Sequence, residues 1–530
     1  MTSNLPALVI IVPLLASLVA AGAGWFNRKA PFYIAVIALL ISFISSVLLL
    51  AQVVATGVAI EYQMAGWPAP VGIVYVIDHL SAMVLVVITF VAFVNLIGNR
   101  QAVETEFKNK EGAFNALYVL FTAGLVGMTA TGDAFNLYVL LEIASLSGYA
   151  LIGLGSSRAP LATLNYLFLG TIGATFYLLG VGYLYIATGS LNMADLATII
   201  PSMMNSSTIL FAFIICLTGL LVKMAIFPVH GWLPGAYSES STVSAGLIAP
   251  LTTKVTIYIM VRICLTLFTP EYTFGYIDPT DIMVAIAVAS IIFGSLSALA
   301  QKDFKRMLSY IIIAEVGYMV GGFFLGNRMG VSGAILHIVN DAAMTLALFM
   351  AAGIFIWKTG DEKQSSLKGL YAKMPFTMAG FTLAALSVVG VPPTCGFFSK
   401  WYLISGGIAA GQYLFVGALI FSSLINAVLF FRIFEIALFE PFKSHHHAGD
   451  EEDKVESHHG ETIVDPGVIE SAQQYSGSDS HDHGAIVIKE PPLPMLVPFL
   501  GVCVLLLILG LYSGSIVNNI IHFAIPAGII

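Results

Sequence analysis

Residues 220–234 have the sequence LLVKMAIFPVHGWLP, an apolar run that contains one lysine, Lys223, and two prolines, Pro228 and Pro234. A charged side chain at the centre of a bilayer costs roughly 2.5–3.5 kcal/mol, so a lysine in a membrane helix should face protein or water. Proline interrupts a helix because it has no N–H and its ring clashes with the preceding turn. A broken helix is tolerated in a membrane where the break is buried in protein or lines a cavity. The stretch therefore predicts a broken membrane helix inside a bundle.

The composition of the whole chain agrees with a membrane protein. Of 530 residues, 58% are hydrophobic and 10% are charged, whereas soluble chains carry about 25% charged residues. This excludes a cytosolic enzyme, a nucleic-acid binder and a secreted disulfide scaffold. The cysteines stand singly in apolar runs, so we expect buried thiols and neither a disulfide framework nor a metal site; they are Cys216, Cys264, Cys395 and Cys503.

Apolar runs long enough to cross about 30 Å of hydrocarbon predict an all-α polytopic membrane protein with about 14 transmembrane helices. The expected spans are 5–25, 31–55, 77–98, 113–131, 133–154, 160–189, 206–228, 243–268, 282–300, 308–326, 330–357, 376–404, 411–440 and 493–520. The first run lacks a preceding basic segment, so we expect a retained span and no cleaved signal peptide.

Lysine and arginine gather in the loops that follow odd-numbered spans, which predicts that these loops face the cytoplasm. Those basic residues are Arg28, Lys29, Arg100, Lys108, Lys110, Arg158, Lys302, Lys305, Arg306, Lys358, Lys363, Lys368, Lys373, Lys443, Lys454 and Lys489. Arg328 is the exception in the loops that follow even-numbered spans. We therefore expect a multi-pass protein of the cell inner (plasma) membrane with both termini outside the cytoplasm.

The predicted cytoplasmic loop 443–491 differs from the rest of the chain. It holds 11 acidic and three basic residues and seven of the 11 histidines. Few apolar residues leave little to bury, so we expect disorder. A metal-buffering or pH-sensing role is the alternative to a solvated linker, because imidazole titrates near neutrality.

The predicted spans contain ionisable side chains that lipid would not accept: Glu142, Lys223, Lys254, Glu315, His337, Asp341 and Lys400. The four central charges alone would cost on the order of 10 kcal/mol if unpaired, so they must face one another or water inside the bundle. One interpretation is a set of buried salt bridges that fix helix register. The other is an ion or proton path, because a buried lysine can lose and regain a proton near neutral pH. Glu142 and Lys223 could form a switchable pair in such a path.

A second broken helix is predicted at 388–403, VVGVPPTCGFFSKWYL, which carries Lys400. It lies five spans after the first broken helix, so corresponding helices run in opposite directions and an inverted repeat is expected. A weak sequence similarity between 143–155 (IASLSGYALIGLG) and 312–324 (IIAEVGYMVGGFF) supports the repeat. The expected organisation is N-terminal helices in 1–112, repeat units in 113–268 and 282–440, the loop 443–491 and a C-terminal helix in 492–530.

These motifs resemble the antiporter-like subunits shared by Mrp-type sodium/proton antiporters, membrane-bound hydrogenases and respiratory complex I. The resemblance covers about residues 70–440 and rests on DHLS from Asp78, TGDAFNLYVLLE ending at Glu142, KMAIFPVHGWLPGAY from Lys223, DFKRMLSY from Asp303 and GVPPTCGFFSKW around Lys400. GDAFNLY favours the D-type branch of the Mrp antiporter subunits over the complex I relatives. The resemblance implies a proton path through Glu142, Lys223, Lys254, His337 and Lys400.

The chain departs from the family pattern in two places. In HIVNDAAMTLALF (337–349), Asp341 and Thr345 stand where many relatives have histidine and lysine, and Tyr237 stands where many have histidine. Asp341 could accept from Lys400 or hold a cation.

Other polar side chains are candidates for accessory or structural roles. Glu315 is a further candidate within the set of buried charges. His230 is a candidate proton site or an anchor of the helix break, and Asp133 is expected to cap the helix that follows it. Arg262 and Arg432 are expected to reach the lipid headgroups.

The sequence predicts a proton-translocating subunit of a multisubunit antiporter that exchanges protons for Na+ or another monovalent cation, with other hydrophobic subunits as partners. A proton- or sodium-pumping module of a redox-driven complex is the alternative; the sequence has no haem, flavin or iron–sulfur motif, so no cofactor is expected on this chain. A non-conducting scaffold is a third possibility. No catalytic centre is visible in the sequence.

Overall fold

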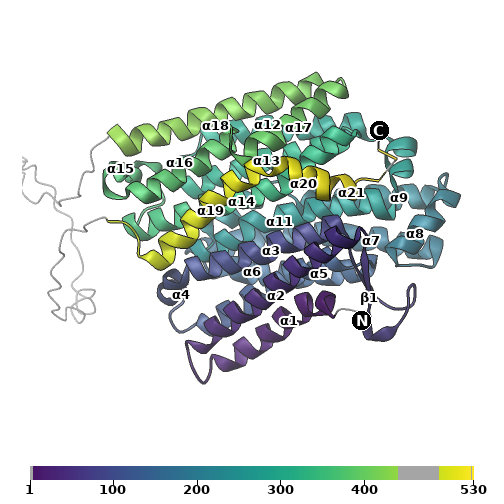
Figure 1. Cartoon of the computed structure of the whole chain (residues 1–530), viewed down its shortest axis with the longest axis horizontal. Coiled ribbons are helices and arrows are strands. Elements are labelled where there is room, and N and C mark those ends of the chain that lie inside the picture. Colours follow the sequence, from purple (N-terminus) through teal and green to yellow (C-terminus); the bar gives the residue numbers. More distant parts are fainter. Residues whose placement is uncertain (1–3, 440–488, 527, 530) are drawn as a thin grey trace, which may run out of the picture.

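The computed structural model describes residues 4–439, 489–526 and 528–529. Nearly all of the histidine- and acid-rich loop predicted at 443–491 lies outside these residues. The described part is a helical bundle with one small β-hairpin (Figure 1). The helices are α1 (Leu5–Ala23), α2 (Ala30–Thr56), α3 (His79–Gly98), α4 (Arg100–Glu106), α5 (Glu111–Ala130), α6 (Ala134–Gly153), α7 (Ala159–Thr188), α8 (Met193–Ile199), α9 (Ser207–Lys223), α10 (Leu233–Glu239), α11 (Thr242–Arg262), α12 (Thr280–Leu299), α13 (Phe304–Phe324), α14 (Arg328–Thr359), α15 (Leu370–Lys373), α16 (Pro375–Val389), α17 (Cys395–Ala409), α18 (Tyr413–Phe439), α19 (Leu493–Leu511), α20 (Ser513–Ile516) and α21 (His522–Ala524).

Within the described ranges, 12 helices are long and apolar enough to cross a membrane. The other two predicted spans are 206–228 and 376–404, for which breaks were predicted: α9 ends at Lys223 and is followed by α10, and 376–404 is divided into α16 and α17. The predicted all-α polytopic fold and its broken helices are therefore confirmed. The four cysteines are buried and unpaired, as expected.

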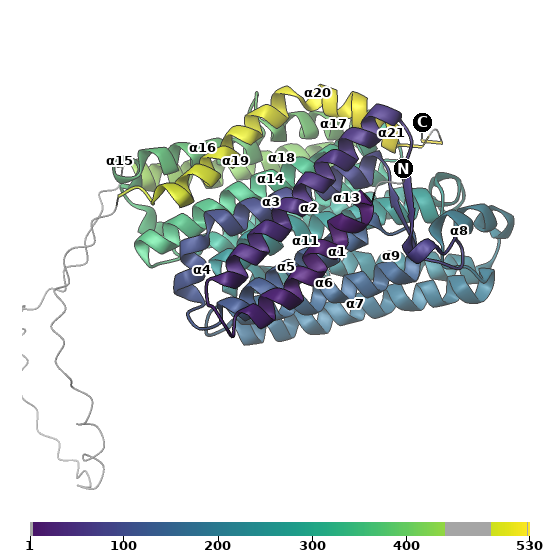
Figure 2. The ribbon, with the colours of Figure 1, turned by 60° about the horizontal axis from the view of Figure 1, so that its bottom comes forward.

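The loops of the bundle gather at two opposite ends (Figures 1 and 2). At the α4 end lie α4 and α15 together with the chain on both sides of the segment 440–488. At the hairpin end lie α8, α21, the start of α1 and the hairpin of β1 (Ile60–Gln63) and β2 (Val74–Ile77). The two strands pair antiparallel, with Ile60 opposite Ile77. The first and last described residues are thus at the same end of the molecule.

Three helices form the centre of the bundle. The most apolar windows of α14, α13 and α11 are 100%, 94% and 89% buried, whereas those of α2, α7, α18 and α19 are each 39% buried. The helix α11 packs on α14, and α14 also packs on α13 and α17. The helices that carry most of the predicted charges are therefore enclosed by protein, whereas the outer helices have large exposed apolar faces.

At each helix break, a side chain that follows the break donates a hydrogen bond to a backbone carbonyl of the helix before the break. Helix ends leave backbone carbonyls without partners. The indole Nε1 of Trp232 donates to the Val222 carbonyl near the end of α9, at 3.0 Å. The ammonium of Lys400 donates to the Val388 carbonyl near the end of α16, at 2.6 Å. At each break, a carbonyl of the first helix is therefore satisfied by protein, whereas the prolines of the breaks, Pro228, Pro392 and Pro393, are exposed at the surface of the described chain.

Short polar side chains begin several helices. Asp133 accepts from the Asn136 N–H at the start of α6, so its predicted capping role is confirmed. Asp303 accepts from the Arg306 N–H, which starts α13 four residues earlier than the apolar run suggested. The hairpin, α4 and α8 were not predicted, because elements of four to seven residues leave no clear apolar period.

Candidate functional site

A buried ion pair joins two central helices. Lys254 on α11 and Asp341 on α14 lie 2.9 Å apart, Nζ to Oδ2, with side chains 2% and 3% exposed. Thr345, one helical turn after Asp341, donates to Asp341 Oδ1 at 2.9 Å and accepts from Lys254 at 3.4 Å. The two positions of α14 that were expected to depart from the family pattern thus contact the same lysine. The expected contact between Asp341 and Lys400 is wrong, because the carboxylate is directed at Lys254.

A histidine and a glutamate form the next contact along α14. His337 and Asp341 are four residues apart, so they lie on the same face of that helix. The Nε2 atom of His337 is 2.5 Å from Glu315 Oε2, and its Nδ1 is 2.8 Å from Ser399 Oγ. The His337 and Glu315 side chains are both fully buried. Glu315 is therefore the direct partner of His337.

Lys400 follows Ser399 on α17 and is also buried. Besides Val388 O, its ammonium donates to Ser423 Oγ at 3.1 Å and lies 5.1 Å from the centre of the Tyr318 ring. We call Lys254, Asp341, His337, Glu315 and Lys400 the C-terminal cluster. The Tyr318 ring contacts both His337 and Lys400. The pair of Lys254 and Asp341 lies one turn further along α14 from His337.

The predicted pair of Glu142 and Lys223 is not a direct contact. The ammonium of Lys223, at the end of α9, donates to Ser145 Oγ at 2.7 Å and lies 6.0 Å from the Tyr149 ring centre. Glu142 is half-buried on α6, one turn before Ser145, and near enough for its charge to act on Lys223. We call Glu142, Ser145, Tyr149 and Lys223 the N-terminal cluster.

Tyr237 on α10 lies between the two clusters. Its buried hydroxyl faces Thr252 of α11 and is within electrostatic range of Asp341. His230, in the break between α9 and α10, packs between the rings of Phe227 and Phe293. No contact of His230 with either cluster is present among the described residues.

Several buried oxygens in and between the clusters have no well-directed hydrogen bond to protein: Glu142 Oε1, Tyr237 Oη, Thr252 Oγ1, Glu315 Oε1, Asn340 Oδ1 and Asp341 Oδ2. Buried polar groups are normally hydrogen-bonded to protein or to ordered water. The region between the clusters therefore has the polar lining that bound water requires. In the described part of the chain, no three histidine, cysteine, aspartate or glutamate side chains are grouped so that they could hold a metal ion.

A further ion pair lies at the hairpin end. Arg262 donates to both carboxylate oxygens of Asp78 at 2.6 and 2.8 Å. The expectation that Arg262 reaches lipid headgroups is therefore wrong. Burial opposes the charge of Asp78, but the charge and hydrogen bonds of Arg262 outweigh it and hold the pKa of that carboxyl well below its usual range. Because Asp78 also caps α3, this pair fixes that helix against α11.

Sequence reasoning missed the hydroxyl partners of the ionisable side chains, such as Ser145, Ser399 and Ser423. A serine in an apolar run is too common to stand out, and its role depends on which helix faces it. The glutamate, lysine and histidine side chains stood out because lipid excludes them.

Comparison with known proteins gives consistent matches. Residues 131–426 match the family described as NADH:quinone oxidoreductase/Mrp antiporter, TM. The chain is 40% identical to the NADH-quinone oxidoreductase subunit N of Desulforudis audaxviator, over 99% of each chain. It is 32% identical to the D subunit of the Na(+)/H(+) antiporter of Alkalihalophilus pseudofirmus, over 73% of this chain and 78% of the relative. A chain of the membrane-bound sulfane sulfur reductase, an archaeal respiratory membrane complex, superposes with a TM-score of 0.84 at 29% identity, with 98% of this chain and 97% of that chain covered.

Proposed function

The chain belongs to the NADH:quinone oxidoreductase/Mrp antiporter family of membrane subunits, and from this premise we propose that it carries protons through its two clusters of buried ionisable side chains. It is an antiporter-like, multi-span membrane subunit. The proposed exchange is of protons for Na+ or another monovalent cation within a multisubunit assembly, as the name of the relative from Alkalihalophilus pseudofirmus suggests.

The observation that carries the proposal is the C-terminal cluster. Buried ion pairs stabilise a protein poorly compared with apolar packing, so a set of them at the bundle centre calls for another role. Intramembrane ionisable residues that face the protein interior mark ion pathways and proton relays. The contacts from Lys254 to Lys400 supply groups that can hold, accept or donate a proton along α14 and α17.

The proposed relay depends on the effect of one charge on the next. A proton that binds Glu142 neutralises the carboxylate near Lys223, so Lys223 holds its own proton less tightly. The released proton can cross the region of unpaired oxygens by way of water and Tyr237. At the ion pair the proton binds the Asp341 carboxylate, and Lys254, which has lost its counter-charge, can release its own proton. His337 is the next group that can accept a proton, and Lys400 can accept one only after it has released its own. Asp133 and His230 have no place in this sequence of steps.

We further infer that the segments 113–268 and 282–440 are inverted repeats. The similarity between 143–155 and 312–324 aligns Tyr149 with Tyr318. The lysine of each broken helix lies over the corresponding tyrosine ring, Lys223 over Tyr149 and Lys400 over Tyr318. Such cation–π contacts are effective within about 6 Å of the ring centre. The remaining segments, 1–112 and 492–530, would then flank the repeats.

We also propose that the α4 end faces the cytoplasm. In the described part of the chain, Lys and Arg of the loops gather at that end, and Arg262 and Arg328 are the basic residues at the hairpin end. The positive-inside rule then puts both termini outside the cytoplasm.

The proposal is tested by purifying the native assembly, identifying its subunits by mass spectrometry and measuring sodium-dependent proton flux in vesicles. We expect hydrophobic subunits as partners, and flux that is lost in the separate variants Glu142→Gln and Lys223→Met while the assembly stays intact. Loss of assembly in both variants would instead favour a scaffold in which the charges are structural pairs.

A redox-driven complex is the second candidate function. It is favoured by the 40% identity with an NADH-quinone oxidoreductase subunit and by the superposition on a chain of a respiratory membrane complex. In that case electron transfer on a partner drives the same relay. Iron–sulfur subunits in the purified assembly would support the redox-driven complex. Their absence, together with sodium-dependent proton flux, would contradict it.

A further inference from the structure

Arg328 is the basic residue at the hairpin end that the proposed function leaves unexplained. It begins α14, at the end of the molecule that otherwise carries few cations. Among the described residues it makes no salt bridge with a carboxylate. Its guanidinium instead contacts the ring and the backbone carbonyl of His522 on α21, at 3.0–3.3 Å. Arginine matches phosphate geometry well because its planar group presents several donors in a fixed fork.

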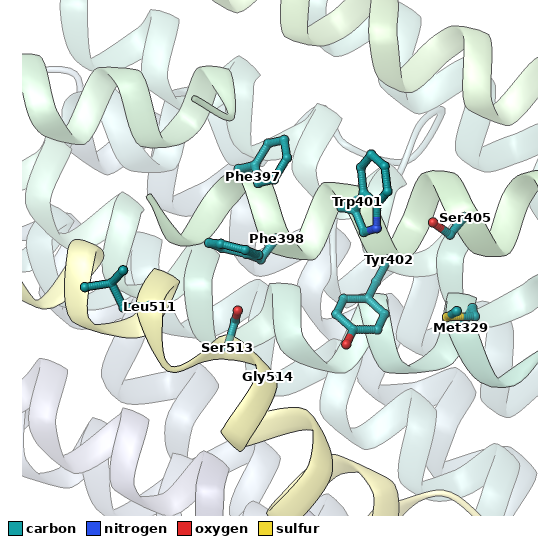
Figure 3. A pocket seen from close by; sticks show the side chains of 9 residues that line it. All are labelled: Met329, Phe397, Phe398, Trp401, Tyr402, Ser405, Leu511, Ser513 and Gly514. Carbon is teal, nitrogen blue, oxygen red and sulfur yellow. The ribbon is translucent and has the colours of Figure 1, made fainter. Parts of the chain in front are cut away.

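A pocket opens at the end of α14 that begins with Arg328; Arg328 itself is not among the residues that line it. It has a volume of about 600 Å³ and lies between α17 and the turn from α19 to α20. Figure 3 shows Phe398 and Tyr402 of α17 directed toward Leu511 and Ser513 on the other wall. Met329, the residue after Arg328, also lines the pocket, and Trp401 lies on its α17 side.

The pocket combines the features of a site for an amphiphile. Its aromatic and aliphatic wall suits an acyl chain, while the hydroxyl groups of Tyr402, Ser405 and Ser513 supply polar contacts. Aromatic side chains of this kind gather at membrane–water interfaces. The side chain of Trp401 is 60% exposed, so the pocket is open on the outer surface of the bundle.

We propose that this pocket binds an anionic phospholipid from the leaflet at the hairpin end, with one acyl chain against α17 and the phosphate on Arg328. The positive charge of Arg328 favours a lipid with net negative charge, because no carboxylate in the described chain neutralises this arginine. The pocket-lining residues Phe397 and Trp401 flank Lys400 on α17. The bound lipid would therefore pack against the helix that carries the last group of the C-terminal cluster.

The test uses the purified assembly in phosphatidylcholine vesicles that contain either brominated phosphatidylglycerol or brominated phosphatidylcholine at equal mole fraction. Bromine on the acyl chain quenches a tryptophan that it contacts. Subtracting the emission of a Trp401→Phe assembly isolates the Trp401 signal from those of the other tryptophans. We expect the pocket to prefer brominated phosphatidylglycerol over brominated phosphatidylcholine about fivefold, which is the effect of one basic residue near a membrane surface. Arg328→Gln should abolish this preference. The matched control Arg158→Gln, an exposed arginine at the α4 end, should leave it unchanged.

A second variant tests the pocket itself. A Cβ on Gly514, which lines the pocket, would meet no atom within 4 Å, so Gly514→Leu should fold and fill the space. We expect it to weaken quenching by both lipids, whereas Gly501→Leu, on an equally open stretch of α19, should not. Equal quenching by the two lipids would overturn the proposal, because it would mean an unspecific lipid surface. Absence of quenching by either lipid would also overturn it, since a partner subunit would then cover the pocket.

Discussion

The two residues of the central α14 motif that were expected to depart from the family pattern contact a single lysine. Asp341 pairs with Lys254, and Thr345 bonds to both of them. A lysine at position 345 would bring a second ammonium group next to Lys254, while threonine supplies a neutral hydroxyl. The departures therefore compensate each other, and the buried charge at this point stays balanced.

Removing only one charge of this pair should destabilise the protein. Asp341→Asn leaves Lys254 buried without a counter-charge, which typically costs about 3–5 kcal/mol. The double variant Lys254→Met/Asp341→Leu should recover most of that loss, because it leaves no unpaired charge. Thermal unfolding of the purified assembly measures both. Glu104→Gln, which breaks an ion pair with half-exposed partners, is the control and should have little effect. Equal stability of Asp341→Asn and the unmodified protein would show that the pair is not formed.

The pair of Asp78 and Arg262 predicts a specific pH dependence. Since the pKa of Asp78 in the folded protein lies below its ordinary value, its stabilising contribution is present above the ordinary carboxyl pKa of about 3.9 and is lost as pH falls through the lower folded value. Asp78→Asn should therefore lower stability by roughly 2–3 kcal/mol, by an amount that is constant from about pH 5 to 8. Thermal unfolding of both proteins across this range is the measurement. A difference that shrinks between about pH 7 and 5 would mean that Asp78 titrates near neutrality.

At the scale of helices, the sequence predicts far more than at the scale of contacts. The lengths of the apolar runs predicted the spans, and prolines near a lysine predicted both helix breaks. Both predictions were possible because lipid restricts what a membrane-crossing segment can contain. The partner of each buried charge was not predictable in the same way. Whether Asp341 meets Lys254 or Lys400 depends on how α14 is rotated between α11 and α17, and a single helix does not specify that rotation. The pairing of Asp78 with Arg262 was missed for the same reason, since the two residues lie 184 positions apart.

The position of Lys223 depends on close packing of α7 against α9. A Cβ on Gly219 would lie 2.5 Å from the Gly173 carbonyl oxygen and 2.8 Å from the Tyr177 nitrogen, so the backbone of one helix would have to move. Gly219→Ala should lower stability by about 1–3 kcal/mol and reduce transport, because Lys223 follows one turn later on the same helix. Gly182→Ala on α7, where the added Cβ meets nothing within 4 Å, is the matched control. Thermal unfolding and flux assays on the two variants give the comparison, and similar values for both would show that this packing is not critical.

At the scale of the whole molecule, charge is distributed in two distinct ways. Loop cations gather at the α4 end, as orientation in a membrane requires. The ionisable side chains of the two clusters instead lie inside the bundle, where the most buried helices surround them. A set of apolar outer helices thus encloses a polar interior, which is the arrangement that the proposed proton path needs.

Whether protons pass through the buried clusters can be measured as proton flux in vesicles that contain the Lys254→Met/Asp341→Leu assembly. This variant removes both members of the ion pair and so leaves neither of them buried without its partner. Intact subunit composition and thermal stability can be verified in the same preparation. We predict that flux falls by at least about 100-fold, the usual contribution of a positioned proton-transfer group. Flux close to that of the unmodified assembly, with the variant complex intact, would contradict the account and assign these charges a structural role.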